Sequence, residues 1–122
     1  MKLIQDDRIT IQTQTGSSEL ECPRCGSNYL HHQAVVSYDI RREDDDQCIV
    51  TTVGSGKVST EVVPMKDAGN PSSRRDGLAI TFTCEGCTVD ATTDVLELTI
   101  AQHKGCTELR WRYSPRQPQP KY

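Results

Sequence analysis

The pattern of hydrophobic and polar positions predicts a chain built from β-strands. Its longest alternating run places apolar side chains at five of the six alternate positions from residue 30 to residue 40, with His32 at the sixth and mainly polar side chains between them. One buried and one solvated face is typical of an antiparallel strand, and Val35 is the exception to the alternation. The apolar positions of this run are Leu30, Ala34, Val36, Tyr38 and Ile40.

Shorter runs with the same alternation predict the remaining strands. They cover residues 8–14, 48–53, 58–63, 78–83, 96–100 and 109–113. Gly54-Ser55-Gly56 and His103-Lys104-Gly105 have the composition of tight turns and predict two hairpins. Residues 66–77 carry no apolar pattern and predict a long flexible loop. Because no segment keeps a 3.6-residue apolar period over helical length, the predicted fold class is all-β with antiparallel hairpins.

The composition indicates that the fold needs a metal ion or disulfides for stability. The chain has 122 residues, of which 34% are hydrophobic and 5% aromatic, and it carries six cysteines. Small domains with so thin a core usually recruit a metal ion or disulfides. Residues 1–8 contain no apolar stretch of signal-peptide length, and no later run could span a bilayer. We therefore expect a cytoplasmic protein, in which paired cysteines are typical of metal sites.

Two CxxC motifs carry the candidate chemistry, Cys22-Pro23-Arg24-Cys25-Gly26 and Cys84-Glu85-Gly86-Cys87. Two cysteines separated by two residues can reach one ion from a single tight turn, and Gly26 can adopt the positive φ that such a turn needs. A redox or disulfide pair is the alternative, but a thioredoxin-like CxxC needs a strand-then-helix context that neither motif has. The motifs predict one structural Zn²⁺ held by Cys22, Cys25, Cys84 and Cys87.

The sequence CPRCG followed by a later CxxC resembles the zinc-ribbon superfamily, which implies that one zinc ion clamps two knuckles and that the four cysteines are its ligands. Fifty-eight residues separate Cys25 from Cys84, more than a minimal ribbon has. We therefore expect one elaborated zinc-ribbon domain over residues 1–113, with a small sheet inserted at about 29–77. NPSSRRDGLAITFTCEGC and LELTIAQHKGCTELRW are similar to small uncharacterised zinc-ribbon proteins of actinobacterial phages and prophages. That resemblance implies a phage or prophage protein in the host cytoplasm, with no known activity.

Cys48 and Cys106 are expected to be small buried side chains, although a ligand role for Cys106 in place of Cys87 stays open. His31 is expected to be exposed, His32 partly buried, and His103 to lie in a turn. Four thiolates close the coordination shell of zinc and leave no position for a substrate. The prediction is therefore a protein that is not an enzyme and has no small-molecule substrate.

Charge bears on the partner. The net charge is −3, with five acidic residues over 39–46 and four basic residues over 110–122. A negative chain lacks a general attraction for phosphate, so a protein partner is the first expectation and membrane binding is not expected. The alternative is a nucleic-acid-binding ribbon with a basic strip, of which Arg110 and Arg112 would form a solvated face. The strip comprises Arg74, Arg75, Arg110, Arg112, Arg116 and Lys121. Residues 114–122 are proline-spaced, and we expect an extended tail that could also bind a protein.

Overall fold

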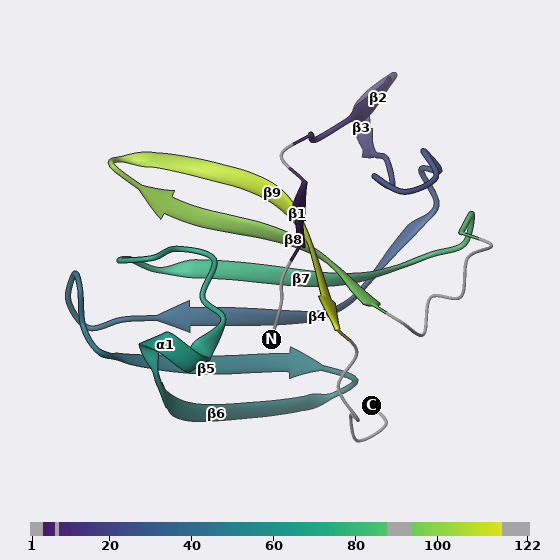
Figure 1. The fold of residues 1–122 in the computed structure, drawn as a ribbon. Coiled ribbons are helices and arrows are strands. Elements are labelled where there is room, and N and C mark those ends of the chain that lie inside the picture. The colour runs from purple at the N-terminus through teal and green to yellow at the C-terminus, as the bar shows by residue number, and fades with distance from the viewer. Residues whose placement is uncertain (1–3, 7, 88–93, 116–122) are drawn as a thin grey trace.

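A computed structural model describes residues 4–6, 8–87 and 94–115 and confirms the all-β prediction. Seven strands form one antiparallel sheet in the order β1-β9-β8-β7-β4-β5-β6, and β2 and β3 form a separate hairpin (Figure 1). The strands are β1 (Ile4–Asp6), β2 (Ile11–Gln14), β3 (Ser17–Leu20), β4 (Leu30–Asp39), β5 (Gln47–Gly54), β6 (Lys57–Pro64), β7 (Gly77–Cys84), β8 (Asp94–His103) and β9 (Cys106–Pro115). Among these residues, no helix is long and apolar enough to cross a membrane.

The strands predicted to form an inserted sheet are continuous with the rest of the molecule. β4 pairs with β5 on one side and with β7 on the other, and β7 also pairs with β8. The segment between the two CxxC motifs therefore widens the main sheet by three strands, β4, β5 and β6 (Figure 1). The predicted limits of the domain and its insertion stay a prediction.

Both predicted hairpin turns are two-residue turns with positive φ. Ser55 and Gly56 have φ of 49° and 76°, and Lys104 and Gly105 have φ of 50° and 81°. Positive φ at both central positions is the type I′ geometry, whose twist matches that of the flanking strands. Because glycine adopts this conformation without strain, Gly56 and Gly105 fix the position of each turn.

A β-bulge explains why Val35 breaks the alternation of β4. The register between β4 and β7 shifts between His32 and Val35, so the two halves of the strand follow different parities. The backbone N–H of Ala34 within the bulge donates to Thr81 Oγ1 over 2.9 Å. A bulge leaves one residue without a ladder partner, and here a side chain replaces the missing acceptor.

The sheet carries a small hydrophobic core on each face. On one, which we call the metal face, Leu96 and Trp111 pack with Cys22, while Phe82 meets Trp111 edge-on at 5.8 Å between ring centres. On the other, the α1 face, the core is formed by Tyr38, Cys48 and Ala79. Neither core is large, as the composition predicts, and the described core residues of the sheet come from its inner strands β4, β5, β7 and β8 and from β9.

The segment predicted to be a flexible loop is instead fixed against the α1 face. It begins with the short helix α1 (Met65–Ala68), which ends at Gly69 with φ of 77°. Met65 and Ala68 pack on the core of this face, and the Ser72 hydroxyl donates to the carbonyl of Gln102 over 2.8 Å. These contacts involve residues distant in sequence, so no local apolar period could signal them.

Candidate metal centre

The first knuckle lies in the turn between β3 and β4. The Cys22 N–H donates to the Ser27 carbonyl over 2.7 Å, and the Gly26 N–H donates to the Cys22 carbonyl over 2.8 Å. Gly26 has φ of 79°, as the sequence predicted for this position. The turn is thus closed by its own backbone, and both thiols are held on one side of it.

The second knuckle begins where β7 ends, at Cys84. Because Cys84 pairs with Leu30 at the start of β4, the sheet register itself brings this knuckle next to the first. The Glu85 N–H donates to the Tyr29 carbonyl over 3.0 Å and extends that pairing into the turn. Gly86 then lies against Ser27: a Cβ on Gly86 would be 2.5 Å from the Ser27 Cβ, a distance that real side chains do not adopt. Thr88 follows the second CxxC motif as Gly26 follows the first, and it lies outside the described residues.

The four predicted ligands converge on one point. All four sulfurs lie within 4.8 Å of one another, and three of the separations are 3.5 Å (Cys25 to Cys84), 3.6 Å (Cys22 to Cys87) and 3.6 Å (Cys25 to Cys87). A tetrahedral ion with metal–sulfur bonds of about 2.3 Å places its sulfurs about 3.8 Å apart. A disulfide would need about 2.0 Å. The cluster therefore fits one tetrahedral metal ion and is compatible with a zinc-ribbon-like site.

The thiols differ in how easily they lose a proton. Burial would raise the pKa of Cys22, but the backbone N–H groups of Arg24 and Cys25 and the neighbouring thiols outweigh it and lower that pKa to about 7. Burial together with the adjacent thiols raises the pKa of Cys84 and, much further, that of Cys87. One anion in the cluster disfavours the next, so a positive ion is the natural means of keeping all four thiols deprotonated.

The cluster is part of the core on the metal face. Cys22 is buried against Leu96 and Trp111, and Cys84 and Cys87 pack on the same residues. Arg24, between the first two ligands, lies over the ring of Tyr113 with 5.6 Å between guanidinium carbon and ring centre. Arg24 was not among the predicted functional residues. Its place inside the CxxC motif is the signal that could have done so.

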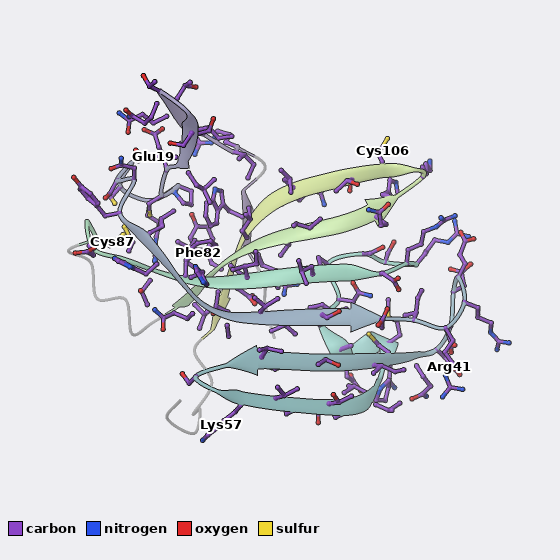
Figure 2. All side chains as sticks on the ribbon, turned by 180° about the vertical axis from the view of Figure 1, so that it is seen from behind. Glu19, Arg41, Lys57, Phe82, Cys87 and Cys106 are labelled. Carbon is purple, nitrogen blue, oxygen red and sulfur yellow. The ribbon has the colours of Figure 1, made fainter. Side chains whose placement is uncertain are left out.

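The remaining cysteines and histidines lie outside the four-thiol cluster. Cys48 is fully buried on the α1 face, as predicted, whereas Cys106 is exposed at the tip of the β8–β9 hairpin, far from Cys87 (Figure 2). The prediction of a buried Cys106 is therefore wrong, because the hairpin tip extends beyond both cores. His32, expected to be partly buried, is exposed. His31 is exposed, as expected, and its Nε2 lies within hydrogen-bonding distance of the Glu85 carboxylate of the second knuckle.

The predicted basic strip does not form a free cationic surface in the described part of the chain. Arg74 binds Asp44 and Glu43, with its Nε 2.8 Å from Asp44 Oδ1, and holds the pKa of Asp44 below its usual value. Arg75 Nη2 lies 3.3 Å from Glu43, and Arg110 Nη2 lies 3.8 Å from Glu108. The acidic 39–46 segment therefore neutralises part of the strip.

Arg112 was predicted to be on a solvated face and is instead buried, with 3% of its surface exposed. Its Nε lies 3.1 Å from Glu97 Oε1, and its Nη1 donates to the Gly69 carbonyl over 2.6 Å. The segment after α1 covers this part of the α1 face, so Arg112 cannot contact a partner. Arg116 and Lys121 lie outside the described residues.

Comparisons with known proteins give no match: no family model, no curated protein and no solved structure is significantly similar to this chain. The four-thiol cluster and the surfaces around it are therefore the features of the molecule that bear on its function.

Proposed function

We propose that this chain is a non-enzymatic binding module whose fold is held by one structural zinc ion and whose partner is another protein. The observation that carries the proposal is the four-thiol cluster, with its sulfurs spaced for a tetrahedral ion and with Cys22 buried in the core of the metal face. An all-thiolate donor set favours zinc over the harder cations, which prefer oxygen ligands.

The place of the cluster in the fold supports a structural role. It joins the turn after β3 to the end of β7, two segments that are distant in sequence, since 58 residues lie between Cys25 and Cys84. Zinc binding in such a site contributes directly to the folding free energy, because the unfolded chain holds no preformed site. Four thiolates also leave no coordination position for water or substrate, which supports a function without chemistry at the metal.

A protein partner is favoured over nucleic acid by the state of the arginines. Each of the four described members of the basic strip has a carboxylate beside it: Arg74, Arg75, Arg110 and Arg112. A paired guanidinium offers little net charge to phosphate. Nucleic-acid binding stays the second candidate, because Arg116 and Lys121 lie in the proline-spaced tail. A cytoplasmic location and a phage or prophage origin belong to the proposal and rest on the sequence alone.

The metal is tested by elemental analysis of protein purified without added zinc. We expect about one zinc per chain, loss of zinc and of thermal stability in Cys22→Ser, and neither loss in Cys106→Ser, the matched control at the exposed hairpin tip. A Cys22→Ser variant that keeps both zinc and stability would refute the ligand assignment. Iron in place of zinc would refute the identification of the bound ion as zinc.

The partner class is tested by binding to heparin and single-stranded DNA at physiological salt. We expect no retention, because the described arginines are paired with acids. Retention that is lost when residues 114–122 are removed would favour the nucleic-acid candidate. The same truncation in a pull-down from the native host shows whether the tail holds the protein partner.

A further inference from the structure

The strand β6 is an open edge of the seven-stranded sheet. It runs for eight residues, pairs with β5 alone among the strands that the structure describes, and lies at the outside of the sheet in Figure 1. Val58 and Val62 are 70% and 59% exposed, which is high for β-branched apolar side chains. A long exposed edge with apolar side chains is a template for pairing with another strand. The opposite edge, β1, has only three residues.

The hairpin turn determines which backbone groups of β6 are free. In a two-residue turn the flanking residues, Gly54 and Lys57, form a hydrogen-bonded pair, and such pairs then alternate along the ladder. Lys57, Ser59 and Glu61 thus direct their N–H and C=O groups toward β5. The N–H and C=O groups of the alternate residues, Val58, Thr60 and Val62, point away from the sheet. Pro64, which has no N–H, ends the strand in this outward series.

We propose that β6 pairs with β6 of a second copy of this chain, antiparallel and centred on Thr60, to give a two-fold symmetric dimer with one continuous sheet. In this register Thr60 lies opposite Thr60 of the partner subunit, and Val58 lies opposite Val62 of the partner subunit. All three outward-pointing residues then form hydrogen-bonded pairs with two bonds each. A shift of the partner subunit by two residues in one direction loses one of these three pairs. A shift by two residues in the other direction places Pro64 of the partner subunit, which has no N–H, opposite Val58.

The side chains of β6 match their own symmetry copies. Val58, Thr60 and Val62 project on the metal face, in line with Val53, Thr51 and Ile49 of β5. The Thr51 and Thr60 hydroxyls already hydrogen-bond across the hairpin at 3.2 Å, and the dimer extends this threonine row across the two-fold axis. On either side of the two-fold axis, the exposed Val58 of one subunit lies opposite Val62 of the partner subunit. Such cross-strand pairs are the unit that stabilises a sheet.

Charge complementarity supports the same register on the α1 face. Lys57 and Glu61 are exposed there, and neither forms an ion pair within the part of the chain that the structure describes. In the dimer Lys57 lies diagonally across from Glu61 of the partner subunit, within reach of a long side chain. The two-fold axis creates this pair twice. The edge is thus complementary to itself in backbone, apolar and charged groups, which selects a second copy over an unrelated strand.

Hydrogen exchange of the zinc-loaded full chain tests the register directly. Sedimentation is measured from roughly 10 to 500 µM, since interfaces of this small size associate in the micromolar range. We expect a monomer–dimer equilibrium, with the amides of Val58, Thr60 and Val62 gaining protection as the dimer forms. The amides of Ser59 and Glu61 should be protected at every concentration, because they bond to β5. A monomer throughout, or a dimer without the alternating protection, overturns the proposal.

Variants separate the interface from the fold. Thr60→Pro removes only an outward N–H and should weaken the dimer at least tenfold, whereas Thr60→Val, which lacks the hydroxyl but keeps the N–H, should dimerise. Lys57→Glu and Glu61→Lys should each weaken association about fivefold, and the double exchange should restore it. Unfolding curves confirm that each variant is folded. If Thr60→Pro destabilises the monomer, the charge exchange alone decides: a folded double variant no tighter than the single ones overturns the pairing.

Discussion

Gly86 lies where the two knuckles meet, and the first prediction concerns it. Because an added Cβ would be 2.5 Å from the Ser27 Cβ and 3.3 Å from the Cys25 sulfur, Gly86→Ala must push the second knuckle away from the first. We expect metal affinity to fall by about 10- to 100-fold, as is typical for residues that orient ligands. Competition with a chromophoric chelator measures it. Glu85→Ala, an exposed change in the same turn, should leave affinity within about threefold.

The buried pair of Arg112 and Glu97 gives the second prediction. Arg112→Met removes the guanidinium that lies beside the buried Glu97 carboxylate, and we expect a loss of about 3–5 kcal/mol in the free energy of unfolding. Replacing both, as Arg112→Met with Glu97→Leu, should cost much less, because no buried charge is left without its counterion. Urea unfolding of the zinc-loaded chain measures each variant. Equal losses in the single and double variants would contradict this account.

Trp111 and Arg112 show how far the fold could be predicted from the sequence at the residue scale. Alternation along β9 correctly places Trp111 and Arg112 on opposite faces. It cannot tell that both faces are covered, since Trp111 is 0% and Arg112 3% exposed. The cover over Arg112 comes from the segment after α1, which is remote in sequence. The four thiols were predictable because the spacing of each CxxC fixes its local geometry before any tertiary contact forms.

At the scale of elements, most strands and both hairpin turns followed from alternation and turn chemistry. β1 was not predicted, since three residues are too few to show a period, and β4 was predicted without its bulge. Of the three strands β4, β5 and β6, the last two were predicted as a hairpin. Their union with β7 was not, because pairing between strands distant in sequence leaves no local signal.

The β5–β6 turn provides the third prediction. Ser55 adopts φ of 49°, a conformation that asparagine tolerates better than serine. Ser55→Asn should therefore raise the free energy of unfolding by about 0.5 kcal/mol, and Gly56→Ala should lower it by about 1 kcal/mol. Thermal unfolding of the zinc-loaded chain checks both signs. A stabilising Gly56→Ala would mean that the turn is not of type I′.

At the scale of the whole molecule, the two cores stabilise different parts of the sheet. The metal face holds its core around the four-thiol cluster at one end of the sheet, where Cys87 and Glu19 lie, and Arg41 marks the opposite end (Figure 2). The core of the α1 face contains Tyr38 and Cys48 and no metal ligand. Burial, partly offset by Arg112, raises the pKa of Tyr38, which agrees with a dry environment there. Metal removal should therefore not act equally on the two cores.

The last prediction follows from that difference. On adding excess EDTA, the emission of Trp111, the one tryptophan of the chain, should shift to the red as the core around Cys22 opens. The hydrogen-bonded amides of Cys22, Glu85 and Phe82 should exchange at least 100-fold faster, and those of Tyr38 and Val50 less than tenfold faster, because local unfolding spares elements packed elsewhere. Hydrogen exchange by NMR resolves these sites, and zinc in excess should reverse the change. Equal acceleration at all five amides would show that the zinc ion holds the sheet as a single cooperative unit, contrary to the division into two cores.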